Sequence, residues 1–398
     1  MAVLASGRRT TALKELGFQT LKADLTDPST HDPAFWRPHL AGGVHLVNAA
    51  GILTGSDARF KAIHVSAPLA ACQARDGGHA VLISAVGIDR SKTGFARWRR
   101  FGERAVKPLA ALTILRPGLV LADTSYGGSS LIRALAAWPW RTPLVGAGTQ
   151  PFNPIHAEDL AQLVLACLQN PPGFGPFDVG GPTTVTQGAM IAAYRRWLGL
   201  PKVMQIALPL ALARGLGRLG DALRIGPLSL TAVQQLEVGV LADPTDLVAK
   251  FGPLGRPFSA MLAARPAGTQ DLWQARLYLL QPAIRLVLAL MWLVSGLVGL
   301  TTPPGSFLPI LAHLPLGEAA LTGLARGADL ADLGLALALL RNWRPQSVGW
   351  AQLALVIAYT AGFSLIAPSE WLAPLGGLLK NLPVLALIAT HIALAEER

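Results

Sequence analysis

The sequence predicts a doubly wound α/β sheet of parallel strands followed by an all-α domain of four transmembrane helices. Within residues 80–120, an apolar run ends in Ser84 and a second ends in Pro117-Gly118, with a helical pattern between them, which is one β-α-β unit. Beyond residue 271 lie four apolar segments of about 20 residues, each long enough to cross a bilayer core. We expect a sheet domain at 1–200, a helical connector at 201–270 and a membrane domain at 271–398.

The composition is that of a partly membrane-embedded protein. Hydrophobic residues make up 52% of the 398 residues and charged residues 14%, more apolar than a typical soluble domain. Residues 1–200 hold 20 Lys and Arg against 12 Asp and Glu, consistent with ordinary solubility or with attraction to anionic lipid headgroups. No motif indicates nucleic-acid binding. Cys72 and Cys167 lack the spacing of metal ligands, so we expect buried thiols and no metal site.

The first elements are a strand at Val3–Ala5, a helix at Thr10–Leu16 and a strand at Phe18–Ala23. A dinucleotide-binding sheet opens with a strand and a Gly-rich turn whose amides hold the pyrophosphate. No GxGxxG precedes Val3. The family resemblance given below places Val3–Arg9 at the end of the second strand, and so implies an N-terminally truncated sheet that lacks its first strand and Gly-rich loop. A start codon assigned too far downstream and a relative that never had the loop are the two alternatives.

Polar and small residues follow the predicted strands. The strand at Gly43–Val47 leads into Asn48-Ala49-Ala50-Gly51, and Ser84 and Pro117-Gly118 end the next two strands. Ligands of parallel sheets bind outside these carboxyl ends. Most of the basic residues on the helix after Ser84 are expected on a solvated face. His64, on the helix 60–71, is expected to be packed or solvated rather than catalytic.

The series Ser84, Phe95-x-x-x-Arg99 and Pro117-Gly118 resembles the active-site region of the atypical (extended) short-chain dehydrogenase/reductases. That family carries Ser, Tyr-x-x-x-Lys and Pro-Gly in this order. The resemblance implies a Rossmann fold, NADP or NAD as cofactor, and a catalytic pair in which Ser84 holds the substrate oxygen and Arg99 orients the ribose. The implied cofactor contacts are Arg8, Arg9, Asp24, Leu25, Asn48, Ala49, Ala50, Gly51, Ser84, Arg99, Pro117 and Gly118.

Several of these positions have a second interpretation. Phe95 replaces the family Tyr, and a phenyl ring cannot exchange a proton, so the resemblance implies nucleotide binding more strongly than hydride transfer. Arg8 and Arg9 favour the 2′-phosphate of NADP, or are solvated loop residues. Asp24-Leu25 resembles the adenine-contacting pair of the family, or Asp24 starts a turn or helix.

Towards residue 200 the functional signals weaken. Asp159 is expected to begin a helix at 159–169 rather than to take part in chemistry. The apolar helix at 206–223 carries Arg214 and Arg218 four residues apart. It is either an interfacial helix, with its arginines at the lipid phosphates, or a helix packed on the sheet domain.

The loops of the membrane domain predict its orientation. Residues 301–317 and 368–375 hold no Lys or Arg, whereas residues 341–347 hold two Arg, and Arg276 precedes the first segment. This alternation predicts four spans, with the sheet domain in the cytoplasm. That the membrane is a bacterial inner membrane is implied by the resemblance given next.

The same region resembles the DoxX-like membrane domains in Arg276–Pro282, Trp292–Gly296 and Lys380–Pro383. Fusions of a reductase with this domain are compared with a nucleotide-binding accessory subunit of respiratory complex I. The second span carries Arg326, Asp329 and Asp332, which form a site for a headgroup, a quinone or a proton path, or a structural ion pair. His391 is a weaker candidate for this site.

The leading hypothesis is a membrane-anchored, NAD(P)-binding oxidoreductase that acts on a lipophilic carbonyl or quinone with weak or lost Tyr-Lys catalysis. A second hypothesis is a non-catalytic nucleotide-sensing or assembly subunit of a membrane complex, which implies a membrane-protein partner. A third is a membrane protein whose Rossmann part no longer binds nucleotide.

Overall fold

The computed structural model describes residues 2–226, 228–312, 314–372 and 377–395. The chain divides into two compact units, which are described separately. Unit 1 comprises residues 1–221 and 226–272, and unit 2 comprises residues 222–225 and 273–398. The connector expected at 201–270 therefore falls almost entirely in unit 1, and the main division lies at 272/273.

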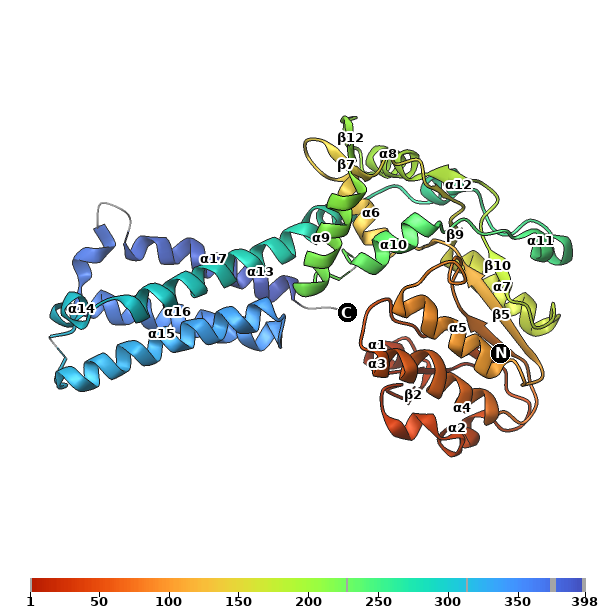
Figure 1. Ribbon diagram of the computed structural model, residues 1–398, viewed down its shortest axis with the longest axis horizontal. Helices are drawn as coiled ribbons and strands as arrows, with labels where there is room; N and C mark the ends of the chain where they lie inside the picture. The colour runs from red at the N-terminus through yellow and green to blue at the C-terminus, as the bar shows by residue number, and fades with distance from the viewer. Residues whose placement is uncertain (1, 227, 313, 373–376, 396–398) are drawn as a thin grey trace. The chain divides into compact units, whose positions relative to one another are not determined.

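Unit 1 is built on a parallel sheet of Rossmann type with the strand order β10-β5-β4-β3. Two of these strands, β5 and β10, are labelled in Figure 1. Its strands are β3 (Leu46–Asn48), β4 (Ala80–Ile83), β5 (Leu112–Pro117) and β10 (Phe177–Val179). β4 and most of β5 are buried, as expected of strands covered on both faces. The predicted β-α-β unit at 80–120 is confirmed, with α5 (Gly94–Val106) as its helix.

Two further strands form a separate pair. β1 (Leu4–Gly7) and β2 (Gln19–Lys22) are parallel and joined through α1 (Thr11–Glu15). Among the described residues, neither strand is hydrogen-bonded to the four-stranded sheet. Arg8 to Thr10 connect β1 to α1, so no Gly-rich turn lies at this junction.

The remaining short strands pair as β6 (Val120–Leu121) with β9 (Ile155–His156), β7 (Thr142–Val145) with β12 (Gln205–Leu208), and β8 (Pro151–Phe152) with β11 (Val185–Thr186). The prediction of a helix at 206–223 is wrong at its N-terminal end. Residues 205–208 pair in register with β7, and α9 (Leu210–Ala222) begins after Pro209. The partner strand, distant in sequence, outweighs the apolar helical pattern of these residues.

Helices of unit 1 flank these strands. They include α2 (Pro33–Leu40), α6 (Gly128–Ala136), α7 (Ala157–Gln169), α8 (Gln187–Trp197), α10 (Leu230–Val238), α11 (Thr245–Phe251) and α12 (Phe258–Ala263). Asp159 lies in the first turn of α7 and accepts hydrogen bonds from the backbone and side chain of Arg256, which is a structural role. α9 packs Gly217 and Gly220 against residues 228–230.

The helix expected at 60–71 is interrupted. α3 (Asp57–Lys61) and α4 (Ala67–Gln73) are joined by a π-helical turn at Ala62–Ser66, which contains His64. α5 packs directly on this turn. The contact is so close that a Cβ atom at Gly102 would lie only 2.0 Å from the carbonyl oxygen of His64. Glycine at this position lets the two backbones touch.

The arginines of α5 are held in place more than expected. Arg97 forms an ion pair with Asp57 at 2.7 Å, and Arg100 donates to the carbonyl oxygens of Ile88 and Ser91. Arg97, Arg104 and Lys107 are exposed, so the prediction of a mostly solvated basic face is confirmed, and the half-buried Arg100 is the residue that departs from it. The partners of Arg97 and Arg100 lie 9 to 40 residues away along the chain, outside the reach of helical spacing rules.

Unit 2 is helical, with α13 (Thr269–Thr301), α14 (Pro304–Leu311), α15 (Glu318–Leu340), α16 (Pro345–Ile366) and α17 (Asn381–Leu394). Its core joins α13, α15, α16 and α17 through Leu288, Trp292, Ala336, Val356 and Ile388. The four apolar segments predicted at 282–300, 318–340, 348–367 and 376–395 each overlap one of these four helices. Residues 373–376, in the fourth segment and the loop before it, lie outside the described residues.

α13 and α16 are long and apolar enough to cross a membrane. α15 carries Arg326, Asp329 and Asp332, and α17 spans 14 residues. Large apolar side chains face outwards along α13, with Leu290 60% exposed and Val298 58% exposed. An apolar surface of this kind is unusual in water and indicates association with a membrane.

Replacing Gly102 with Ala should destabilise unit 1. The added methyl group meets backbone rather than a movable side chain, so we expect a loss of about 1–3 kcal/mol in the free energy of unfolding. The matched control is Gly215→Ala in α9, where a Cβ atom meets nothing within 4 Å. There we expect no loss, or a gain of up to ~1 kcal/mol. Urea midpoints from pulse proteolysis of the full chain in detergent measure both, and equal midpoints for the two variants would contradict the packing argument.

Candidate functional site

A small cavity lies at the carboxyl ends of β3 and β4, beneath α5. It has a volume of about 20 Å³, which is room for about one water molecule or one polar group of a ligand. Its walls are Asn48, His64, Leu82, Ile83, Ser84, Arg99, Gly102 and Glu103. The fold therefore brings together residues from the turn after β3, the end of β4 and one face of α5.

Arg99 supplies the positive charge of this cavity. Its Nη1 donates to the carbonyl oxygen of Ile83 at 2.7 Å, and its guanidinium lies 5.6 Å from the centre of the Phe95 ring. Its Nε has no hydrogen-bond partner among the described residues. Burial lowers the pKa of Arg99 to about 10, while nearby Glu103 opposes the shift. Arg99 remains charged at neutral pH.

Glu103 does not neutralise Arg99. Its carboxylate binds Arg116 at 2.5 Å, and Arg116 also binds Asp89 at 2.6 Å. In the described part of the chain Arg99 forms no ion pair within 4 Å. A largely buried charge without a counter-ion is costly, and an anionic ligand would lower that cost.

Ser84 is the second unsatisfied group. Its backbone N–H donates to the carbonyl of Leu115 at 2.7 Å, which continues the β4–β5 ladder. The side chain is buried, and its hydroxyl has no hydrogen-bond partner among the described residues. Buried hydroxyl groups are rarely left unpaired, so a ligand atom or a water molecule fits here.

The turn Asn48–Gly51 lies over Arg99. Asn48 accepts a hydrogen bond from the N–H of Ala50 at 3.0 Å, which folds the turn back on itself. A Cβ atom at Gly51 would lie 2.1 Å from Nη2 of Arg99, so only glycine allows this approach. Gly51 and Ala49 are exposed. The backbone therefore covers the guanidinium on one side and is open to a ligand on the other.

His64 is both packed and part of the cavity wall. Its ring stacks on that of Phe60, with 5.7 Å between the ring centres, and meets the Phe95 ring edge-on, with 5.9 Å between the centres. Its Nε2 is hydrogen-bonded to the carbonyl oxygen of Ile52 at 3.0 Å. Burial, together with the charge of Arg99, lowers the pKa of His64 to about 3. The imidazole is neutral at physiological pH and is a poor proton donor. Its place beside the cavity depends on the π-helical turn, which no sequence pattern indicated.

The other predicted site residues lie elsewhere. Gly118 donates to the carbonyl of Val179, and a Cβ atom there would lie 2.8 Å from the carbonyl oxygen of Val240, so the Pro117-Gly118 turn is packed and does not line the cavity. Arg8 and Arg9 are exposed beyond β1.

Asp24 and Leu25 have structural surroundings. Asp24 accepts hydrogen bonds from the N–H and hydroxyl of Thr26, and the backbone bond in particular lowers its pKa. This is the turn interpretation. Leu25 packs on the cluster around Trp36. A ligand role for these two residues stays a prediction.

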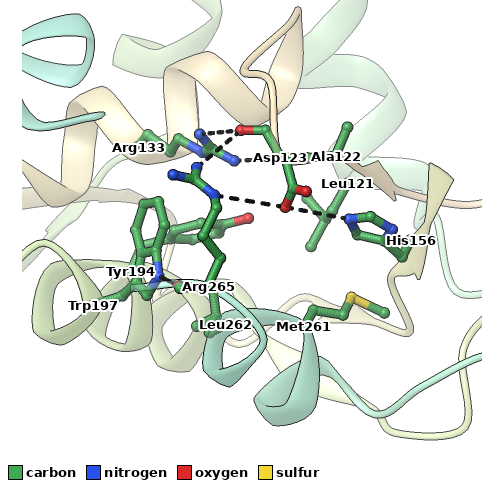
Figure 2. A pocket seen from close by; sticks show the side chains of 10 residues that line it. All are labelled: Leu121, Ala122, Asp123, Arg133, His156, Tyr194, Trp197, Met261, Leu262 and Arg265. Atoms are coloured by element: carbon green, nitrogen blue, oxygen red, sulfur yellow. Dashed lines mark hydrogen bonds and ion pairs between the residues drawn. The ribbon is translucent and has the colours of Figure 1, made fainter. Parts of the chain in front are cut away.

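Unit 1 holds a second polar pocket, between α6, α8 and the segment after α12 (Figure 2). The guanidinium groups of Arg133 and Arg265 lie 5.3 and 5.4 Å from the Trp197 ring. Arg265 binds Asp271 at 2.8 Å, and Asp123 lies 3.7 Å from His156 and 3.9 Å from Arg265. The charges here pair with one another, so this pocket is better explained as a structural network than as a ligand site.

Residues 289–389 match the model of the DoxX-like family. A comparison with curated proteins found no match. The comparison with solved structures found many, and the three described here each cover about two thirds of the chain, in its N-terminal part.

One is a dTDP-4-dehydrorhamnose reductase from Clostridium acetobutylicum, with 16% identity, a TM-score of 0.49 and coverage of 66% of this chain and 98% of that one. A second is the enzyme WbmG of Bordetella bronchiseptica in complex with NAD, with 14% identity, a TM-score of 0.48 and coverage of 68% and 86%. A third is the NADPH-dependent quinone oxidoreductase of Escherichia coli with NADPH, with 17% identity, a TM-score of 0.48 and coverage of 66% and 89%.

Acidification should weaken unit 1 through His64. In the unfolded chain His64 titrates near its ordinary value of 6.5, but in the native state its pKa is about 3. Below about pH 6.5 the unfolded state therefore binds a proton that the native state does not, and stability falls by up to ~1.4 kcal/mol per pH unit. Above that pH the contribution is fully present.

Urea unfolding at a series of pH values compares the wild type with His64→Gln, which cannot titrate. We expect a shallower acid slope for the variant. Parallel slopes would mean that His64 is protonated in the native state.

The structure thus joins a Rossmann-type parallel sheet, with a partly unsatisfied polar site at its carboxyl edge, to a DoxX-like helical segment.

Proposed function

We propose that the protein is a membrane-anchored, NAD(P)-binding protein of the short-chain dehydrogenase/reductase type. The observation that carries this proposal is the group formed by the unpaired Arg99, the unpartnered Ser84 hydroxyl and the open backbone at Gly51. All three lie at the carboxyl edge of a parallel sheet, where such sheets bind nucleotides. A dinucleotide offers both the negative charge and the hydroxyl groups that these residues lack.

The residues would share the work of holding the cofactor. Arg99 would bind and orient a ribose or phosphate oxygen, and the turn Asn48–Gly51 would allow close approach of the nicotinamide ribose. Arg8 and Arg9 favour NADP over NAD through the 2′-phosphate. The bound cofactor would supply hydride to a lipophilic carbonyl or quinone whose oxygen Ser84 would hold.

Proton supply limits catalysis at this site. Phe95 is buried among Phe60, Ile88 and Ala96 and has no acidic proton. His64 is neutral, and Glu103 is bound to Arg116. A proton would have to come from water through the small cavity, so we expect slow turnover.

The buried Phe95 also favours a second candidate function. A site that binds the dinucleotide without transferring hydride suits a nucleotide-sensing or assembly subunit of a membrane complex. Such a subunit would bind a partner in the bilayer.

We further propose that unit 2 is a multi-pass domain of a bacterial inner membrane and that unit 1 lies in the cytoplasm. The alternating basic loops support this orientation. α9 supports contact with a lipid surface, since Leu212, Leu216 and Leu219 are exposed along one face. Arg218 is exposed on another side of the helix, and Arg214 is bound to Glu237 at 2.7 Å.

Arg99→Met should weaken dinucleotide binding by about tenfold or more, because a hydrogen bond to a charged group is worth about 1.5–3 kcal/mol. The matched control is Arg104→Met, on an exposed position of the same helix, for which we expect unchanged affinity. Fluorescence titration of the full chain with NADPH and NADH measures both, with NADPH expected to bind tighter. Equal affinity for Arg99→Met and wild type would refute the proposed role of Arg99.

Phe95→Tyr combined with Arg99→Lys restores the family pair and should raise NADPH oxidation with a quinone acceptor. A tyrosine donor typically contributes about 10²–10⁴-fold, so a gain of at least tenfold is expected if Phe95 limits the reaction. The single Phe95→Tyr variant separates the effect of the new tyrosine hydroxyl on the rate from the effect of replacing Arg99 with lysine. Fast turnover in the wild type would exclude the non-catalytic function, and no gain in either variant would favour it.

A further inference from the structure

The polar residues of unit 2 are turned inwards. Asp332, Gln352 and His391 are at most 3% exposed, whereas Leu290 and Leu330 are about 60% exposed. This is the reverse of a water-soluble bundle. Polar and ionisable side chains inside membrane domains are expensive, and they usually face a bundle interior with a functional or pairing role.

Asp332 is the acidic group at the centre of this interior. It lies on α15 and touches both neighbouring helices. Ser295 of α13 donates to its Oδ2 at 2.6 Å, and the hydroxyl of Tyr359 on α16 donates to its Oδ1 at 3.2 Å. Each carboxyl oxygen therefore has a neutral partner.

No cation balances Asp332 in the described part of unit 2. Arg326, two turns earlier on α15, pairs instead with Asp329 at 3.5 Å, and it donates to the carbonyl oxygens of Thr302 at 2.6 Å and of Gly299. The nearest acidic neighbour, Asp329, packs its carboxylate against Gly299. An ionised Asp332 would thus be a buried, uncompensated charge, whereas a protonated Asp332 keeps its hydrogen bonds without that cost.

Further polar groups lie on both sides of Asp332 along the bundle. Towards the start of α13 are Arg285 and His391, and neither ring nitrogen of His391 has a hydrogen-bond partner among the described residues. Between them and Asp332, the indole N–H of Trp292 donates to Gln352 at 2.9 Å.

Towards the other end of α13 lie Arg326, Asp329 and Thr302. At 1.5 Å per residue, the stretch of α13 from Arg285 to its end at Thr301 covers about 24 Å, most of a bilayer core. Ser295, and with it Asp332, lies near its middle.

We propose that Asp332 is a reversible proton-binding site inside the helical unit. It is the central site of a proton pathway along a row of polar residues, called the polar row, which comprises Arg285, His391, Gln352, Asp332, Asp329 and Thr302. The carboxylate takes up one proton and becomes a neutral acid, which is held by Ser295 and Tyr359. It releases the proton again to a water molecule or hydroxyl in the row. This function is independent of nucleotide binding by unit 1.

Dicyclohexylcarbodiimide tests the protonation state of a buried carboxyl. The O–H of a protonated acid adds across one C=N bond of this apolar reagent, and the adduct rearranges to a stable N-acylurea, which mass spectrometry locates. With the full chain in bacterial membranes, we expect labelling of Asp332 at neutral pH. The label should fall roughly tenfold per pH unit once the carboxyl ionises.

Three variants sharpen the test. Asp332→Asn removes the label, while Asp329, which lies three residues away and is paired with Arg326, stays unlabelled and serves as an internal control. Ser295→Ala and Tyr359→Phe each remove a donor that stabilises the carboxylate. In both variants labelling should persist to higher pH than in the wild type, and an unmoved pH profile would mean that these donors do not bind the titrating carboxyl.

Three outcomes would overturn the proposal. One is protection of Asp332 by excess sodium at constant pH, which would assign a metal-cation site instead. Another is labelling of Asp332 that does not change with pH. The third is the absence, in the infrared difference between wild type and Asp332→Asn at neutral pH, of the C=O band of a protonated carboxyl. The infrared measurement does not depend on whether the reagent can reach Asp332. The wild-type pH profile does not depend on whether the variants fold.

Discussion

The site in unit 1 depends on one close contact, in which the guanidinium of Arg99 is held between the end of β4 and the turn after β3. Its Nη1 is bound by the carbonyl of Ile83, and its Nη2 faces the backbone of Gly51 with no space for a side chain. The nearby carboxylate of Glu103 is occupied by Arg116. The positive charge is therefore fixed at the carboxyl edge of the sheet and remains available to a ligand.

A second backbone contact positions that arginine. α5 can approach the π-helical turn at 62–66 only because Gly102 has no side chain. The same approach places His64 against Phe60 and Phe95 and keeps its imidazole neutral. The cavity thus has one fixed cation, one unpartnered hydroxyl and no strong acid. This balance suits the binding of a dinucleotide better than proton transfer to its substrate.

In unit 2 the distribution of polar and apolar side chains is the reverse of that in a water-soluble protein. Its exposed surface is apolar and its interior carries a row of polar groups, with Asp332 hydrogen-bonded to helices on either side. Small residues make this arrangement possible. A Cβ atom at Gly296 would lie 2.7 Å from the backbone of α15, so α13 and α15 approach closely near Asp329 and Asp332. In both units, a glycine without a side chain allows a close approach beside the polar groups.

Much of the architecture could be predicted from local patterns. Apolar runs ending in Ser84 and in Pro117-Gly118 are dictated by burial on both faces of a parallel sheet, and the structure has strands there. Segments of about 20 apolar residues indicated the helices of unit 2 for the same reason, since side-chain hydropathy acts over a few turns. Ser84 and the turn Asn48–Gly51 were placed together because strand ends meet at one edge of a sheet, whereas Arg99 was singled out through the resemblance to the reductase family.

Contacts between residues distant in sequence could not be predicted in this way. Residues 205–208 form a strand because β7 is there to pair with them. Arg97 and Arg100 are bound to partners on other elements, and Gly118 is packed under residue 240 instead of lining the cavity. The amino-acid sequence by itself determined which segments are buried and which side chains end the strands, because these follow from local hydropathy. Only the tertiary structure decided which charges remain unpaired, because pairing depends on three-dimensional neighbours that no spacing along the chain records.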